Sequence, residues 1–252
     1  MFKPKTEKIK QIAEGNQKAI GELEKLFGSS TRIYIDYANV RPWSAKLGWH
    51  IDLKRLKQFL NSFDTIGENS ITFYNGYLAG NERSEKEKSE AENCKYVLRT
   101  KPVKIIKLSI DASSILPDST VLLDQFIRRA LLKKYEISTI EYLNERFKDM
   151  NKKGEYFIED MKCNFDVEIG VDMLLDCERN NAETFALWSG DSDFADPVKK
   201  LLEGGRRVVL CATAGKIASE LNELKNAGLQ IFDIYDIKDF VCWNKEIGKK
   251  IE

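Results

Sequence analysis

The chain has 252 residues, of which 42% are hydrophobic and 32% charged, and its 40 Lys and Arg residues balance 40 Asp and Glu residues. This size allows one large α/β domain or one domain with an insertion, and the zero net charge excludes a chain-wide basic surface for nucleic acid. The only histidine, His50, excludes a zinc site built on histidines, and it excludes a Ser-His-Asp triad unless His50 is the base. The five cysteines are scattered and form no C-x-x-C pair, as is typical of reduced thiols in an intracellular protein. The charged start has no apolar stretch behind it, and no run approaches the ~18 apolar residues of a membrane span, so we expect a cytoplasmic protein.

Apolar residues recur at helical spacing over residues 4–27, which predicts an extra N-terminal helix that ends at Gly28. After it, short β-rich runs alternate with amphipathic segments. The predicted elements are, in order, a strand at about 31–36, a helix near 52–62, a strand at 71–77, a charged helix at 82–99 and a strand at 103–108.

Residues 110–163 break this alternation, because a long helical pattern at roughly 119–150 is followed by a short strand at 156–158. We interpret this stretch as a helical insertion or cap. After it, the predicted elements are a helix at about 170–180, a strand at 184–189, a helix at 196–204, a strand at 206–212, a helix at 215–227 and a strand at 229–234. Strands that alternate with helices predict an α/β fold with a parallel sheet and helices on both faces.

Acidic residues follow two of the predicted strands. Asp36 ends the first strand, and Asp191 and Asp193 follow the strand that ends at Trp188. Asp172 opens an amphipathic segment. Because open α/β sheets bind ligands at the carboxyl ends of their strands, these four acids predict an oxygen-ligand site for Mg²⁺ or Mn²⁺. Acidic sites of this kind often serve metal-assisted hydrolysis of phosphodiesters.

Three further polar residues are candidates for a supporting role. Asn39 could brace the loop after Asp36, and Ser189 could orient a carboxylate by a hydrogen bond. Asp176 lies four residues after Asp172, so a helix would place both on one face. Ordinary structural roles stay open for the acids: a turn or cap for those that follow strands, and a solvated helix edge for those in the amphipathic segment.

Local basic and aromatic residues could contact a nucleic acid. The cluster best placed to bind phosphates lies in the insertion and comprises Arg128, Arg129, Lys133 and Lys134. Trp43 lies on the loop after the first strand and could stack on a base. The alternatives are a solvated helix face for the cations and core packing for the tryptophan.

Three motifs occur in a fixed order along the chain: Ile35-Asp36-Tyr37-Ala38-Asn39, then Gly170-Val171-Asp172-Met173-Leu174-Leu175-Asp176, then Ser189-Gly190-Asp191-Ser192-Asp193-Phe194. This set resembles the NYN domain family, PIN-like ribonuclease domains that include the LabA-like group. The resemblance spans about 31–109 and 166–236, and leaves the insertion outside. One departure is Ile169, which stands where the family often has a lysine.

The resemblance implies a three-layer α/β/α, PIN-like (Rossmann-like) fold and Mg²⁺- or Mn²⁺-dependent cleavage of RNA by an endonuclease. It places metal-binding acids at Asp36, Asp172, Asp191 and Asp193, with Asn39, Ser189 and Asp176 in support. We therefore expect an N-terminal helix at 1–30, an NYN nuclease domain at 31–236 with its insertion at about 110–163, and a C-terminal tail at 237–252.

Other functions are weighed against this one. The missing lysine, the zero net charge and the extra helices favour a non-catalytic RNA-binding or assembly module on the same fold. A phosphatase of the haloacid-dehalogenase kind needs an aspartate where this chain has Ala38, and a Toprim-type nuclease needs a glutamate where it has Asp36. The apolar content of the N-terminal helix and of residues 119–150 predicts a homodimer.

Overall fold

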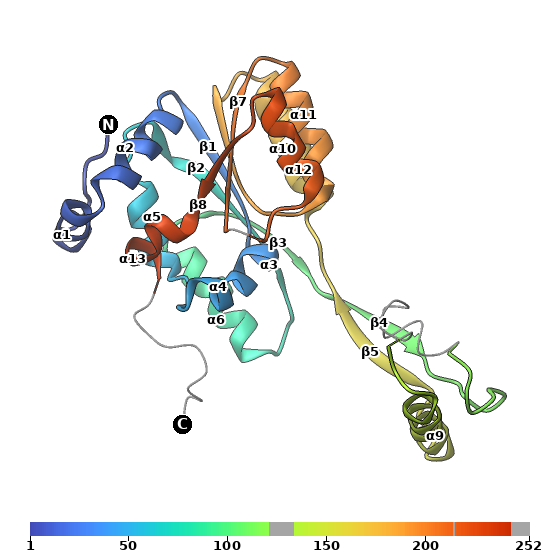
Figure 1. Ribbon diagram of the computed structural model, residues 1–252. Coiled ribbons are helices and arrows are strands. Elements are labelled where there is room, and N and C mark those ends of the chain that lie inside the picture. Colours follow the sequence, from blue (N-terminus) through green and yellow to red (C-terminus); the bar gives the residue numbers. More distant parts are fainter. Residues whose placement is uncertain (121–133, 214, 243–252) are drawn as a thin grey trace. The chain divides into compact units, whose positions relative to one another are not determined.

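The computed structural model describes residues 1–120, 134–213 and 215–242, and the chain divides into two compact units (Figure 1). The first unit contains Met1–Pro102 and the chain from Asn164 onward, and the second contains Val103–Cys163. No helix in the described ranges is long and apolar enough to cross a membrane.

A parallel sheet forms the centre of the first unit. Its order is β3-β2-β1-β6-β7-β8, and every neighbouring pair is parallel. The strands are β1 (Thr31–Asp36), β2 (Ile66–Tyr77), β3 (Val97–Pro102), β6 (Thr184–Trp188), β7 (Arg207–Ala212) and β8 (Gln230–Asp233). All five residues of β6 are buried, as expected for a central strand covered on both faces.

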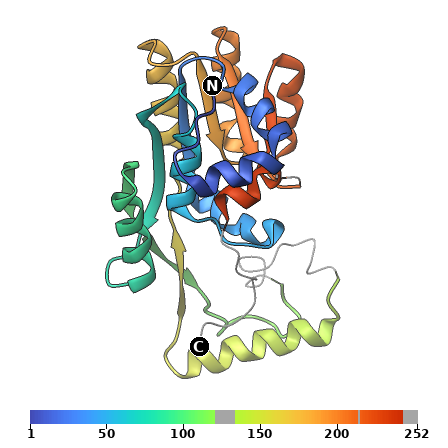
Figure 2. The ribbon, with the colours of Figure 1, turned by 90° about the vertical axis from the view of Figure 1, so that its left-hand side faces the viewer.

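Helices cover both faces of this sheet (Figure 2). On one side lie α10 (Asp166–Glu178) and α11 (Ala195–Glu203), which pack against each other. The other side carries α5 (Leu53–Leu60), α6 (Glu82–Asn93) and α13 (Lys238–Val241). The remaining short elements are α3 (Tyr37–Val40), η1 (Arg41–Trp43), α4 (Ser44–Leu47), η2 (Ser192–Phe194), α12 (Ser219–Glu223), η3 (Leu224–Ala227) and η4 (Ile234–Ile237). The predicted α/β fold with a parallel sheet between helical layers is confirmed.

The N-terminal segment differs from its prediction as one helix over 4–27. It forms two helices, α1 (Glu7–Gly15) and α2 (Gln17–Leu26), which Asn16 separates. Asn16 has a non-helical backbone, and its side-chain amide donates to the carbonyl of Ile12. Glycine and asparagine are both poor helix formers, and asparagine competes for backbone hydrogen bonds, which explains the break.

The third strand of the sheet is not at 103–108, as the sequence predicts. It is β3, which begins inside the segment predicted as the helix 82–99, because α6 ends at Asn93. Pro102 ends β3, since proline lacks the N–H that would continue the ladder. The predicted strand belongs instead to the second unit.

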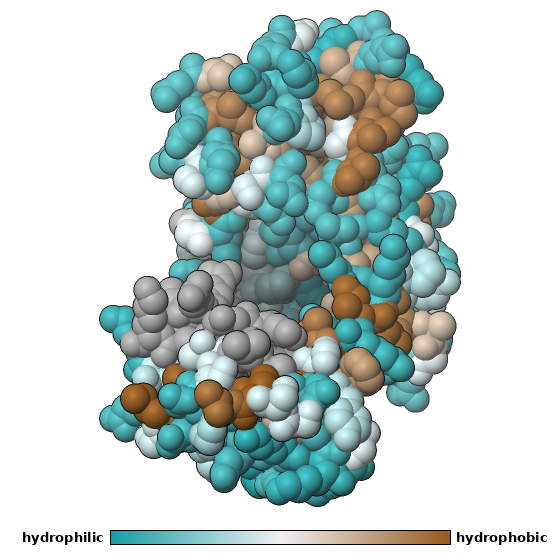
Figure 3. Space-filling view, turned by 90° about the vertical axis from the view of Figure 1, so that its right-hand side faces the viewer, coloured by the Kyte–Doolittle hydropathy of each residue, from teal (hydrophilic) through white to brown (hydrophobic). Residues whose placement is uncertain are grey.

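The second unit contains a two-stranded antiparallel sheet and a long helix (Figure 2). The strands β4 (Lys104–Ser109) and β5 (Phe157–Lys162) pair directly, and α9 spans Ile137–Lys152. In α9, Ile140 packs with Leu143 and Phe147. The part of the predicted helix at 121–133 lies outside the described residues. Apolar side chains also lie on the surface of this unit (Figure 3), among them Ile105, Leu116, Ile137, Phe157 and Met161.

The C-terminal segment is folded beyond the predicted start of a tail at 237. In α13, Phe240 is buried, and its ring centroid lies 4.5 Å from that of Phe59 on α5. The guanidinium of Arg55 donates to the carbonyl oxygens of Asp239 and Cys242. The buried residues Phe240, Val241 and Cys242 therefore tie this segment to the first unit, and residues 243–252 lie outside the described part of the chain.

Candidate functional site

The sheet reverses its strand order between β1 and β6. From β1 the chain proceeds to β2 and β3 on one side, and later to β6, β7 and β8 on the other. Ile35 pairs with Trp188, so the next residues, Asp36 and Ser189, leave neighbouring strands at the same edge. Crevices at such a reversal, outside the carboxyl ends of the strands, are where open α/β sheets bind ligands.

A chain of hydrogen bonds connects the acids that follow these two strands. The Ser189 hydroxyl donates to Asp36 Oδ2 over 3.2 Å and accepts the backbone N–H of Asp191 over 3.3 Å. Asp191 Oδ1 in turn accepts the backbone N–H of Asp193 over 3.3 Å. Three predicted metal ligands, Asp36, Asp191 and Asp193, and the predicted supporting residue Ser189 are thus linked at one edge of the sheet.

Asn39 holds the two loops together. Its backbone N–H donates to Asp36 Oδ1, while its own Oδ1 accepts the N–H of Gly190 over 3.1 Å. A side chain at Gly190 would not fit, because a Cβ there would lie 1.7 Å from the carbonyl oxygen of Lys216. The short connection from β6 to η2 therefore needs glycine at this position for a close backbone approach.

Asp36 is a buried carboxylate at the centre of this edge. It is 5% exposed, and among the described residues no Lys or Arg forms an ion pair with it. Burial raises the pKa of Asp36 to about 6, and the nearby charges of Asp166 and Asp191 add to the rise against the two hydrogen bonds. A buried acid held partly charged near neutral pH is typical of functional sites.

Asp166 is a member of this group that the sequence did not reveal. It is the first residue of α10, and its pKa is raised by burial and by the charges of Asp191 and Asp193. The Asn164 side chain donates to it over 2.8 Å. The sequence places the start of this helix at about 170, whereas it starts one turn earlier. The signal that was available is the pair of acids at Asp166 and Glu168, since acids are favoured in the first turn of a helix.

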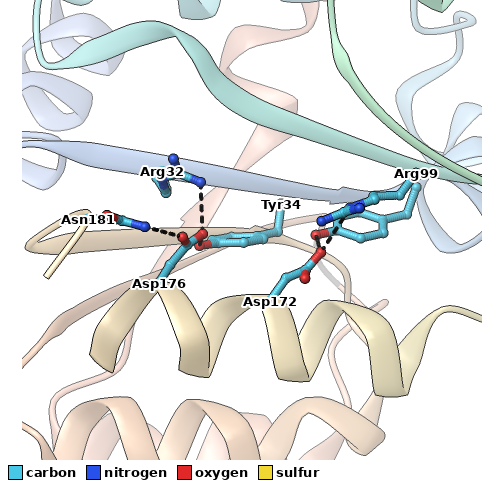
Figure 4. Close-up of polar contacts among 7 residues, drawn as sticks. Arg32, Tyr34, Arg99, Asp172, Asp176 and Asn181 are labelled. Carbon is cyan, nitrogen blue, oxygen red and sulfur yellow. Dashed lines mark hydrogen bonds and ion pairs between the residues drawn. The ribbon is translucent and has the colours of Figure 1, made fainter. Parts of the chain in front are cut away.

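Asp172 lies farther along α10 and is neutralised by other groups (Figure 4). Its Oδ2 accepts the Tyr74 hydroxyl over 2.8 Å and lies 3.3 Å from Nε of Arg99. The Arg99 side chain is 58% exposed, so this ion pair lies at the surface. Asp172 therefore faces the sheet from the predicted helix, in contact with β2 and β3.

Asp176, one turn later, is a structural residue (Figure 4). Its Oδ2 accepts the Tyr34 hydroxyl over 2.7 Å and the Arg32 guanidinium over 2.9 Å. Its Oδ1 accepts the Asn181 amide over 2.7 Å. Three donors satisfy this buried carboxylate, and two of them, Arg32 and Tyr34, join α10 to β1.

Basic residues of β3 line a hollow of about 350 Å³ beside α10, together with Phe165, Glu168 and Asp172. Arg99 pairs with Asp172, while Lys101 pairs with Glu168 and lies 4.5 Å from the centroid of the Phe165 ring. Lys101 also lowers the pKa of Asp166 slightly against the effect of burial. These two cations were missed because the sequence predicts a solvated helix over 82–99, which includes Arg99, and leaves Lys101 in the connection to a strand at 103–108.

The structure describes two of the five residues predicted to contact nucleic acid, Trp43 and Lys134. Trp43 is 2% exposed and packs in the core of the first unit, so its ring has no free face for a base. Lys134 is exposed in the second unit. Arg128, Arg129 and Lys133 lie outside the described residues.

The acids at this edge match the donor type that Mg²⁺ and Mn²⁺ prefer, since all of them are carboxylates. The charge of Asp191 raises the pKa of both Asp36 and Asp166, and the charge of Asp166 adds to the rise at Asp36, so a divalent cation would relieve this repulsion. In the described ranges, no three or more His, Cys, Asp or Glu side chains are grouped closely enough to hold an ion directly. Carboxylate oxygens are suitable ligands for a hard cation, but in this structure the carboxylates of the edge do not all point to one common position.

Comparison with known proteins gives a family match. Residues 119–231 match the family model described as NYN domain. This range includes Asp172, Asp191 and Asp193, begins after Asp36, and extends into the segment that the sequence resemblance left outside. The predicted resemblance to the NYN family is confirmed.

One curated relative is the low amplitude and bright protein LabA of Synechococcus elongatus (strain ATCC 33912 / PCC 7942 / FACHB-805). It is 29% identical over 124 residues, which are 49% of this chain and 56% of the relative. The chain thus spans little more than half the length of that relative. A crystal structure of VPA0982, a protein of unknown function from Vibrio parahaemolyticus RIMD 2210633, aligns with a TM-score of 0.49 and 13% identity, over 84% of this chain and 94% of that one.

Proposed function

From this similarity to the NYN family, we propose that the chain is a Mg²⁺- or Mn²⁺-dependent endoribonuclease that hydrolyses RNA phosphodiester bonds. The observation that carries the proposal is the group of uncompensated carboxylates, Asp36, Asp166 and Asp191, where the strand order of the sheet reverses. Asp172 and Asp193 complete the acidic set that the family resemblance implies.

In the proposed reaction, Asp36 and Asp191 are the principal metal ligands. Ser189 and Asn39 hold their loops in register, so the Asp36 carboxylate enters the site already oriented. Bound Mg²⁺ or Mn²⁺ would supply an activated water and stabilise charge on the phosphate. No histidine is required as a base, in keeping with a chain that has only one.

Arg99 and Lys101 are the proposed contacts for substrate phosphates. Both lie on β3 beside the helix that carries Asp166 and Asp172, and both side chains are partly exposed. They supply positive charge next to the acids although Ile169, which is fully buried, replaces the lysine often found in the family. A local basic edge of this kind reconciles RNA binding with a net charge of zero.

The test is cleavage of labelled single-stranded and structured RNAs with Mn²⁺, Mg²⁺ or excess chelator. Asp191→Asn should lower the cleavage rate about a hundredfold or more, because it removes a ligand from the metal site. The matched control is Asp196→Asn, an exposed aspartate in the first turn of α11 that takes no part in the hydrogen-bonded chain. Full activity of Asp191→Asn, or of the wild type in chelator, would reject the nuclease.

The second candidate is a non-catalytic RNA-binding or assembly module. It is favoured by the buried Ile169 and by the lack, in the described ranges, of a ready ion-binding group of side chains. It predicts binding of RNA that weakens as salt rises, with no cleavage under any metal condition. Metal-dependent turnover lost in Asp191→Asn would exclude it.

A further inference from the structure

A second hollow of the first unit lies between α5 and α6. Its volume is about 640 Å³, within the range of ordinary small-molecule sites. Asn61, at the end of α5, and Glu68, near the start of β2, adjoin the amino-terminal end of the sheet, whereas the acids lie at its carboxyl end. The hollow is therefore separate from the proposed nuclease site.

The charged side chains around this hollow are mostly cationic. Four lysines line it, Lys54, Lys57, Lys86 and Lys95, against one acid, Glu90. Lysine is a common binder of phosphate groups, and its aliphatic stem offers apolar surface at the same time. The excess of positive charge indicates an anionic ligand.

Lys57 is the central member of the group. It is 4% exposed, its ammonium donates to the carbonyl of Glu68 over 3.0 Å, and it lies 5.0 Å from the centroid of the Tyr96 ring. Burial lowers the pKa of Lys57 to about 8. A bound anion would offset the unfavourable burial of this charge.

Two further residues of the hollow bear on its ligand, Asn61 and Lys95. Asn61 Oδ1 is buried and has no hydrogen-bond partner among the described residues, so it can accept an N–H or O–H group from a ligand. Lys95 follows the end of α6 with a φ of 58°, the left-handed conformation that ends many helices and that glycine adopts with less strain, and its N–H donates to the carbonyl of Glu92.

We propose that the hollow between α5 and α6 binds a nucleoside phosphate. The lysines would contact the phosphate oxygens, and Asn61 Oδ1 would accept a hydrogen bond from a base amino group or a sugar hydroxyl. Bare inorganic phosphate fills too little of the space and leaves Asn61 unmatched. The ligand is either a free nucleotide or one nucleotide of an RNA strand.

The test is calorimetric titration of the full chain with ADP, with inorganic phosphate and with a short single-stranded RNA. ADP or the RNA should bind saturably, and Lys57→Met should weaken binding about tenfold or more through loss of a charged hydrogen bond. Lys95→Gly should weaken binding while keeping or raising the melting temperature, which separates loss of charge from loss of fold. The control is Lys199→Met, an exposed lysine on α11.

The outcomes separate the two sources of ligand. Binding of ADP assigns a free nucleotide, and binding of the RNA alone assigns a strand that passes over the hollow. No binding of either probe at millimolar concentration, unchanged affinity in both Lys57→Met and Lys95→Gly, or phosphate binding as tight as ADP would overturn the proposal. None of these results depends on whether the chain cleaves RNA.

Discussion

Asp36 and Asp176 are both buried aspartates, 5% and 8% exposed, yet their surroundings differ. Asp176 receives a guanidinium, a phenol and an amide. Among the described residues, Asp36 receives two neutral donors and no cation, lies near other acids, and has its pKa raised to about 6. The satisfied carboxylate holds the fold together, while the unsatisfied one is kept at a cost in stability where a ligand can use it.

The largest expected effect on stability comes from removing the charge of Asp176, the carboxylate with three donors. Asp176→Asn should lower the free energy of unfolding by roughly 2 kcal/mol, because it removes the negative charge that Arg32 and Tyr34 contact. Chemical denaturation at neutral pH measures this loss. An unchanged midpoint would show that Asp176 does not stabilise the junction of α10 and β1.

The same substitution at Asp36 should act in the opposite direction. Asp36→Asn should raise the free energy of unfolding by about 1–2 kcal/mol at about pH 8, since it removes a buried, uncompensated charge. The folded protein binds a proton at Asp36 more tightly than the unfolded chain, whose carboxyl has a pKa of about 4. The wild type therefore gains stability as the pH falls through about 6, and the advantage of the variant should vanish below about pH 4.

Denaturation curves of the wild type and Asp36→Asn across this pH range check that prediction. Asp196→Asn serves as a reference for an exposed aspartate. A gap between the wild type and Asp36→Asn that stays constant with pH would mean that the Asp36 charge is not the cause.

The smallest effect on stability is expected from breaking the ion pair between Arg99 and Asp172. Arg99→Gln breaks an ion pair whose arginine is 58% exposed, so the free energy of unfolding should change by less than about 0.5 kcal/mol. Binding of RNA should nevertheless weaken, because a proposed phosphate contact is lost. The check is RNA affinity at several salt concentrations, and the idea fails if Arg99→Gln binds with unchanged affinity and salt dependence.

The sequence revealed the main course of the fold and part of the site. Alternating apolar runs predict the parallel sheet, and the acids that follow β1 and β6 meet because these strands are neighbours. Asp166 was not predicted as a site residue, because the sequence places the start of α10 one turn too late, after a segment that belongs to the second unit. Arg99 and Lys101 of β3 were not predicted either, because α6 and β3 have similar polarity and no proline or glycine separates them.

Trp43 and Asp176 show a second limit. Their residue types suit a base contact and a supporting place beside a metal site, but a pattern along the chain does not reveal what lies across the fold. Only the packed structure shows that Trp43 is enclosed and that Arg32 and Tyr34 meet Asp176 from another element.

The most direct test of the account is Mn²⁺ binding measured by calorimetry at neutral pH on the wild type and on Asp36→Asn, with Asp196→Asn as control. We predict a saturable Mn²⁺ site in the wild type and in Asp196→Asn that is lost in Asp36→Asn, although that variant is the more stable protein. Equal Mn²⁺ binding by the wild type and Asp36→Asn, or none by either, would contradict the claim that the uncompensated carboxylates form a metal site.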